Sequence, residues 1–239
     1  MKIDIYNVIF VLCKEKSDDI KKNDNYSLKL LTKKNSDSIL MNMPFEKCYN
    51  LKKNVSSFTE NIIGGNKFYL SQVHFLSEKE HNIANDGNLI FLTTMNENNI
   101  IDLNENYNLV DFSLKDNKIL IIDNKGYEYK TEVVEDEYYH RVNVNDMYLE
   151  RDILFILMSY KLIRSRLDTT NTLFTFMNDI FTIESLHKLY ELILDKQVDK
   201  SNFRKKIINY CKESDQVLQK GYRPTKYYEF DKIEVKLWI

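Results

Sequence analysis

Basic and amide side chains are concentrated between residues 196 and 226 of the 239-residue chain. This segment holds nine Lys or Arg and three Asp or Glu, which gives it a net charge of +6. The net charge of the whole chain is −2, so the rest of the chain has a net charge of −8. Segregated positive charge suits binding to a phosphate backbone, because each neutralised phosphate releases condensed counterions. The alternative is a lysine-rich face that only contacts solvent. The charge pattern favours a nucleic-acid contact in this segment.

A helix is expected from Lys200 to about Cys211, with Asp199 as its N-cap. At about 100° per residue, its apolar residues fall on one face: Phe203, Ile207, Tyr210 and Cys211. The opposite face carries Ser201, Asn202, Lys205 and Asn209, with Arg204 and Lys206 on its flanks. Amides, hydroxyls and cations are the groups that reach base edges and phosphates. We predict that these six residues contact DNA.

Further elements are expected on both sides of this helix. Thr182 is the predicted N-cap of an earlier helix, and residues 195–198 form the turn between the two helices. Residues 217–219 and 226–230 are expected to pair as an antiparallel hairpin. Three further cations of this hairpin would lie along phosphates or enter a minor groove: Lys220, Arg223 and Lys226. Two helices followed by a hairpin predict a winged helix-turn-helix, although the hairpin could also be an ordinary exposed turn.

Strand-like segments dominate the first 135 residues. β-branched and aromatic residues predict strands at 6–13, 26–33, 68–75, 89–94, 118–123 and 127–134. A hairpin turn is expected at residues 123–126. Residues 51–63 have apolar positions at helical spacing, and Gly64 and Gly65 mark the end of that helix. One helix among many strands predicts an α+β sandwich.

A long helix is expected to begin near Glu150. Its apolar stripe consists of Ile153, Ile156, Leu157, Tyr160, Ile163 and Leu167. The segment could join two domains or form a dimer contact. Because no Gly/Ser/Pro-rich linker is present, we expect the two parts of the chain to pack together.

Several other classes are disfavoured by composition. The cysteines Cys13, Cys48 and Cys211 are widely spaced, which predicts reduced thiols with buried structural roles. The four histidines, at positions 74, 81, 140 and 187, never pair at ligand spacing with another His or Cys, so we expect no metal site and no cofactor. The apolar run 8–13 is too short for a signal peptide or a membrane span. We expect a cytoplasmic protein that does not bind membranes.

The C-terminal part resembles a known family. Residues 181–191, 199–206 and 221–230 look like the winged helix of the Nudix-related transcriptional regulators of NAD metabolism, and residues 151–176 are similar to the segment that joins their two domains. Residues 50–75 lie where the Nudix helix and its following strand would be. The resemblance implies a Nudix-like α/β/α sandwich (1–148), a connecting helix and linker (149–180), and a winged helix-turn-helix DNA-binding domain (181–239).

The chain departs from the family of Nudix hydrolases at the catalytic box. That box ends Arg-Glu-apolar-x-Glu-Glu-x-Gly-apolar, and its carboxylates hold divalent metal ions against a pyrophosphate. At residues 57–65 the three glutamate positions are Phe58, Asn61 and Ile62, while Glu60 falls on a position that is not a ligand. We therefore expect no hydrolase activity of the usual kind and no bound metal.

The resemblance implies a DNA-binding transcriptional regulator, and a repressor is the expected type. Its Nudix-like domain would sense ADP-ribose or a related NAD- or sugar-derived metabolite, with effector-binding residues unknown. A homodimer would bind a palindromic operator in double-stranded DNA, because one winged helix covers one half-site. Two alternatives stay open. One is a divergent Nudix hydrolase of nucleoside diphosphate derivatives that uses acids at 78–80 or 135–137; the other is a ligand-free interaction protein whose pocket is filled by residues such as Phe58.

Overall fold

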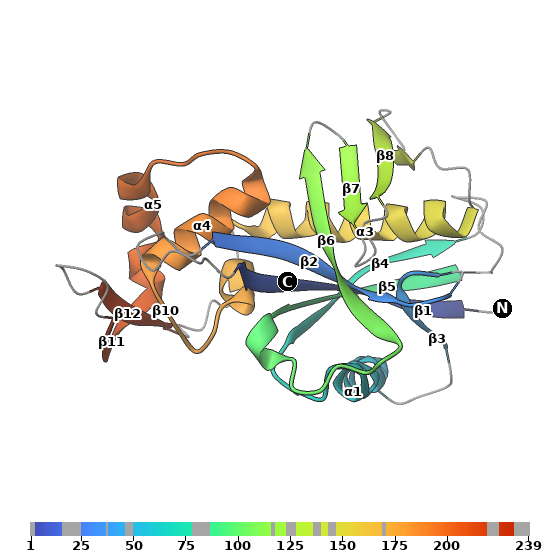
Figure 1. Ribbon diagram of the computed structural model, residues 1–239, viewed down its shortest axis with the longest axis horizontal. Helices are drawn as coiled ribbons and strands as arrows, with labels where there is room; N and C mark the ends of the chain where they lie inside the picture. Colours follow the sequence, from blue (N-terminus) through green and yellow to red (C-terminus); the bar gives the residue numbers. More distant parts are fainter. Residues whose placement is uncertain are drawn as a thin grey trace.

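The computed structural model describes residues 3–15, 25–36, 38–45, 50–77, 87–115, 118–122, 128–135, 140–142, 147–168, 171–218 and 225–231. A large sheet with a helix on each face forms the N-terminal part (Figure 1). A smaller unit of two helices and three short strands lies at one end of this sheet (Figure 1). The α+β fold predicted from the sequence is confirmed.

The large sheet is built around a long central strand. Within the described ranges its strands are β1 (Ile3–Glu15), β2 (Asn25–Lys33), β3 (Met41–Pro44), β4 (Tyr69–Ser77), β5 (Gly87–Asn96), β6 (Tyr107–Lys115), β7 (Lys118–Ile122), β8 (Glu128–Glu135) and β9 (His140–Val142). Their order is β4-β5-β1-β2-β6-β7-β8-β9, and β3 also pairs with β1. Strand β1 runs parallel to β5 and antiparallel to β2 and β3. Nine consecutive residues of β1 are buried because both of its faces are covered.

Two helices cover the opposite faces of the sheet. Helix α1 (Leu51–Ile63) packs through Val55 and Ile62 against one face, where Ile5 and Ile9 of β1 lie. Helix α3 (Met147–Arg166) packs against the other, and the ring of Phe155 meets that of Tyr6 edge-on, with the centroids 5.1 Å apart. Alternate residues of β1 thus serve two separate cores.

The predicted strands of the N-terminal part all have counterparts in the sheet, with longer bounds in β1 and β5. Strands β3, β6 and β9 were not predicted. The helix predicted at residues 51–63 has these bounds, and Gly64 ends it in a left-handed conformation with φ 65°. The turn predicted at 123–126 lies outside the described residues, although the strands that it joins, β7 and β8, pair antiparallel as expected.

The C-terminal unit contains both predicted helices and the predicted hairpin strands. Its elements are η2 (Asn171–Phe176), β10 (Ile180–Phe181), α4 (Ile183–Leu194), α5 (Lys200–Ile207), η3 (Ile208–Tyr210), β11 (Cys211–Leu218) and β12 (Thr225–Phe230). The strands form a sheet in the order β10-β12-β11. Helix α5 is shorter than predicted, because Cys211 already belongs to β11 and pairs with Phe230. Consequently Tyr210 is exposed and Cys211 is half-buried, which corrects their placement on the buried face of a helix.

The small unit is packed directly against the sheet and α3, as the absence of a flexible linker predicted. The Tyr160 hydroxyl donates to the Ile193 carbonyl at 2.8 Å, and Arg164 Nη2 donates to the Leu194 carbonyl at 3.1 Å. At the end of β5, Asn96 Nδ2 donates to the Phe176 carbonyl at 3.1 Å. The carbonyl end of α4 is therefore fixed to the long connecting helix α3.

Candidate nucleic-acid interface and interdomain cleft

Helix α4 begins at the predicted N-cap. The backbone N–H of Ser185 donates to Thr182 Oγ1 at 3.0 Å, and the Thr182 N–H donates to Ser185 Oγ at 3.2 Å. This reciprocal pair is a capping box in which Ser185 stands where Glu or Gln is usual. Leu186, Leu189 and Ile193 are buried, so the helix has the predicted apolar face.

The turn between α4 and α5 is held by two residues that the sequence analysis did not single out. His187 is buried, and its Nε2 lies 2.9 Å from the Val198 carbonyl oxygen. Glu191 Oε1 accepts the Val198 N–H at 2.8 Å. The i,i+4 spacing of His187 and Glu191 was the available signal, since such pairs share a helix face. These contacts fix the orientation of α5 relative to α4.

Helix α5 presents its predicted polar face to solvent. Its apolar side is anchored by Phe203, whose ring lies 5.0 Å from His187 and 5.2 Å from Tyr190, centroid to centroid. Asp199 caps the helix by accepting the Asn202 N–H at 2.8 Å. All six residues that were predicted to contact DNA here are exposed: Ser201, Asn202, Arg204, Lys205, Lys206 and Asn209. Helix α5 and the η3 turn that follows it thus gather three cations, two amides and a hydroxyl.

The cations of this surface differ in their partners. Arg204 Nη2 donates to the Tyr228 hydroxyl at 3.1 Å. Lys206 is paired with Asp168, at the end of the connecting helix. Lys226 on β12 is exposed and paired with Glu213. Lys200 and Lys205 are exposed and have no ion pair within the described part of the chain, so they are the cations of α5 that are most available to a partner.

Two other predicted contact residues cannot be placed. Lys220 and Arg223 lie in the segment 219–224, outside the described residues. Strands β11 and β12 on either side of that segment pair antiparallel, with Leu218 opposite Thr225. The paired strands at the base of a winged-helix hairpin are therefore present.

The degenerate Nudix box lies on α1. Of the positions that carry glutamate in the catalytic box, Phe58 is partly buried against the core, Ile62 is buried and Asn61 is exposed. Glu60 accepts a hydrogen bond from Ser56 Oγ at 3.1 Å. The described residues contain no group of three or more His, Cys, Asp or Glu that could hold a metal ion. The acidic positions 78–80 and 136–137 lie outside the described residues, and nothing is described of the Glu135 side chain.

The two described cysteines are free thiols. Burial raises the pKa of Cys13 to about 12 and that of Cys211 to about 11. The predicted buried role fits Cys13, whereas Cys211 is only half-buried, and Cys48 lies outside the described residues. Among the helices that are described, none is both long and apolar enough to cross a membrane.

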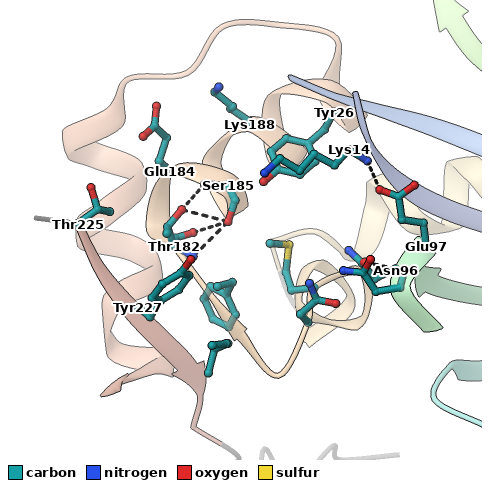
Figure 2. Close-up of a pocket in the computed structure, with 15 residues that line it drawn as sticks. Lys14, Tyr26, Asn96, Glu97, Thr182, Glu184, Ser185, Lys188, Thr225 and Tyr227 are labelled. Carbon is teal, nitrogen blue, oxygen red and sulfur yellow. Dashed lines mark hydrogen bonds between the residues drawn. The ribbon is translucent and has the colours of Figure 1, made fainter. Parts of the chain in front are cut away.

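A cleft of about 360 Å³ lies between the large sheet and the small unit. Its walls on the sheet side come from the ends of β1, β2 and β5 and from η1 (Glu97–Asn99). The opposite walls come from the segment before α4, the first turns of α4, and β12. Figure 2 shows Lys14, Tyr26 and Glu97 on one side and Thr182, Glu184 and Tyr227 on the other. No motif in the sequence pointed to this cleft, because its lining comes from segments far apart in the chain.

Comparisons with known proteins agree with this architecture. Residues 173–230 match the family described as the NrtR DNA-binding winged helix domain. No curated protein matches the chain. The family match covers the elements from η2 to β12, including the exposed face of α5.

Solved structures share the fold over almost the whole chain. The MutT/nudix family protein from Enterococcus faecalis has a TM-score of 0.68 and 17% identity, over 96% of this chain and 87% of that one. NrtR from Shewanella oneidensis has a TM-score of 0.63 and 12% identity, over 95% of this chain and 93% of that one. The structure of the same protein complexed with a 27mer DNA has a TM-score of 0.62 and 10% identity, also over 95% of this chain and 93% of that one. The chain therefore carries an NrtR-type winged helix domain at residues 173–230, and its overall fold is similar to those of the MutT/nudix family protein and of NrtR.

Proposed function

We propose that the protein is a cytoplasmic transcriptional repressor that binds double-stranded DNA through α5 and the β11–β12 hairpin. The observation that carries the proposal is the exposed surface formed by Ser201, Asn202 and Lys205 of α5 and by Asn209 of η3, which follows α5 directly. Asn side chains can bond adenine edges in two places, and Lys reaches guanine edges or phosphates. The structural likeness to an NrtR bound to DNA supports the same partner here.

A homodimer on a palindromic operator is the proposed assembly. One helix of this length covers a single half-site, and specific affinity normally requires two half-sites about one helical turn apart. The proposed boundaries assign residues 1–148 to the sensing domain, 149–180 to the connection and 181–239 to the DNA-binding domain.

The N-terminal domain is proposed to sense ADP-ribose or a related NAD- or sugar-derived metabolite without hydrolysing it. The lack of hydrolysis is supported by Phe58 and Ile62, because apolar side chains cannot replace the carboxylates that hold the metal ions. Incubation with ADP-ribose and Mg²⁺ or Mn²⁺ should give no product. Metal-dependent turnover would instead identify a divergent Nudix hydrolase.

Duplex binding tests the main proposal. We expect a duplex selected from a random library to bind with a steep salt dependence, and the double variant Lys205→Ala, Arg223→Ala to lose binding and to lower the salt slope by about 2. The matched control is Lys52→Ala, Lys53→Ala, which removes the same charge from exposed positions of α1. Equal binding by wild type and the Lys205/Arg223 variant would refute the proposed surface.

A further inference from the structure

We propose that the interdomain cleft is a ligand site of its own, and that it takes an uncharged polyhydroxylated molecule of sugar size. The claim that this ligand regulates DNA binding rests on the proposed function, whereas the claim that the cleft binds it does not. A cleft of about 360 Å³ has the size of small-molecule sites, and such sites favour the seams between domains.

Among the polar side chains of the cleft, some are held by hydrogen bonds within the protein. Thr182 and Ser185 are used by the capping box of α4, and Asn96 bonds the Phe176 carbonyl and the Asn98 N–H. A second group has side chains without a hydrogen-bond partner in the described part of the chain: Asn98, Asn178, Glu184, Thr225 and Tyr227. These amides, carboxylate and hydroxyls are donors and acceptors that a bound molecule could satisfy.

The charge of the lining selects the ligand class. Lys14 and Lys188 are balanced by Glu97 and Glu184, so the cleft has no excess positive charge with which to hold a pyrophosphate. Hydroxyl groups both donate and accept, as the amides and carboxylates of the lining require. The rings of Tyr26 and Tyr227, on opposite sides of the cleft, offer apolar faces to the C–H groups of such a molecule (Figure 2).

The position of the cleft connects ligand binding to the DNA-reading surface. Its walls belong to both parts of the chain, so a ligand that bonds both favours one arrangement of the small unit on the sheet. On β12, Tyr227 lines the cleft, while the adjacent Tyr228 is buried and accepts a hydrogen bond from Arg204 of α5 at 3.1 Å. Neighbouring residues of one strand thus contact the proposed ligand and the proposed recognition helix.

Calorimetric titration of the full chain tests the site with named probes: D-ribose, D-glucose, myo-inositol and ADP-ribose. We expect at least one of the three neutral probes to bind. Asn178→Ala and Tyr227→Phe should each weaken that binding by roughly five- to tenfold, because each removes one hydrogen bond to the ligand. The matched controls Asn61→Ala and Tyr69→Phe, at exposed positions of α1 and β4, should bind as wild type does.

The outcomes separate the inference from the proposed function. Three results would overturn the inference. The first is that none of the three neutral probes binds, and the second is that the control variants weaken binding as much as Asn178→Ala and Tyr227→Phe do. The third is that ADP-ribose binds and its binding depends on Asn178 and Tyr227. A bound neutral probe should also change the duplex affinity of the wild type by twofold or more; binding without such a change would overturn the regulatory role alone. Cleft binding by a chain that binds no duplex would refute the proposed function and leave the ligand site standing.

Discussion

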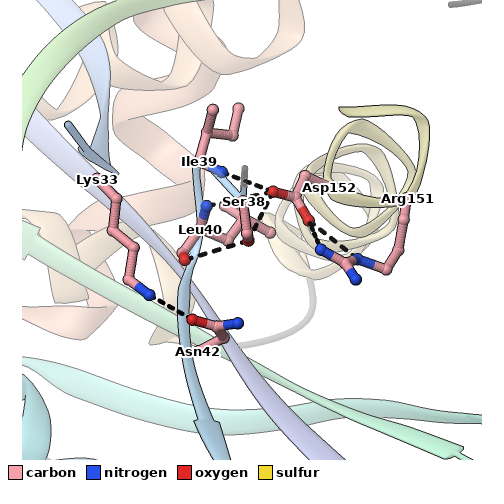
Figure 3. Close-up of polar contacts among 7 residues, drawn as sticks. All are labelled: Lys33, Ser38, Ile39, Leu40, Asn42, Arg151 and Asp152. Atoms are coloured by element: carbon pink, nitrogen blue, oxygen red, sulfur yellow. Dashed lines mark hydrogen bonds and ion pairs between the residues drawn. The ribbon is translucent and has the colours of Figure 1, made fainter. Parts of the chain in front are cut away.

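A single buried carboxylate joins the connecting helix to the sheet. Asp152, near the start of α3, is inaccessible to solvent and accepts hydrogen bonds from Ser38 Oγ at 2.8 Å and from the Ile39 N–H at 2.7 Å. Its other oxygen accepts two bonds from Arg151, at 3.1 and 2.9 Å (Figure 3). The Arg151 guanidinium in turn lies 4.7 Å above the ring of Tyr6. The Asp152 carboxylate therefore connects α3 to the segment before β3 directly, and to β1 through Arg151.

Removal of this carboxylate should be costly. We predict that Asp152→Ala lowers the free energy of unfolding by about 3–5 kcal/mol, because it leaves the Arg151 charge and buried backbone N–H groups without their partner. The control Asp111→Ala breaks an exposed pair with Lys29 and should cost at most about 1 kcal/mol. Urea unfolding measures both. Equal, small losses would show that the Asp152 contacts contribute little.

Cys13 should be chemically inert in the folded protein. Burial raises the pKa of its thiol to about 12, whereas an unfolded cysteine titrates near about 8.5. Because the folded pKa is the higher one, the contribution of Cys13 to stability is complete below about pH 8.5 and declines as the pH rises toward the folded value. We predict that iodoacetamide at pH 8 leaves Cys13 unmodified until urea unfolds the chain. Labelling of the native protein at the unfolded rate, seen by peptide mass spectrometry, would contradict this.

At the scale of secondary structure, elements defined by nearby residues were predictable. The bounds of α1 and the N-caps Thr182 and Asp199 agree with the sequence analysis. Each depends on hydrogen bonds within four residues, so the local sequence contains the information. The exposure of Asn202 and Lys205 follows in the same way from helical periodicity and a buried Phe203.

Elements that depend on distant partners were not predictable. Strand β3 is short and pairs with β1 some 34 residues away in sequence, where Met41 lies opposite Asn7. Strand β6 follows an Asn-rich segment and is placed by its pairing with β2. The early start of β11 likewise depends on Cys211 pairing with Phe230. Long-range pairing decided each of these bounds, against weak local preference.

The ion pair between Asp168 and Lys206 should limit the charge that α5 offers to DNA. The Tyr190 hydroxyl donates to Asp168 Oδ1 at 2.5 Å, the same oxygen that Lys206 contacts. These hydrogen bonds lower the pKa of Asp168, so the carboxylate stays charged throughout the neutral range and pairs with Lys206 until the pH falls below the ordinary Asp range.

Neutralising Asp168 should therefore strengthen duplex binding. We predict that Asp168→Asn raises affinity at low salt and steepens the salt slope by about 1, because Lys206 becomes free to contact a phosphate. The control Asp179→Asn removes the same charge from an exposed pair with Lys67, 2.7 Å away, and should have the smaller effect. Fluorescence anisotropy over a salt series measures both. Identical slopes in the two variants would show that Lys206 makes no phosphate contact.

At the scale of the whole molecule, the connecting helix belongs to both parts. The ring of Tyr160 lies 5.0 Å from Phe112 and 5.9 Å from Phe10 in the large sheet, while its hydroxyl bonds the end of α4. The sequence predicted that the parts are packed together, since it has no flexible linker. It did not predict the cleft that remains between them, whose lining extends from Lys14 to Tyr227. Such a site exists only once the parts have docked.

Amide hydrogen exchange of the full chain, with and without a selected duplex, tests the central claim most directly. If α5 reads DNA, peptides that cover residues 200–207 should gain protection on duplex binding, because the helix is then covered by the groove, whereas peptides of α1 at 51–63 should exchange as before. Protection confined to α1 or to the large sheet, with unchanged exchange in α5, would contradict the account.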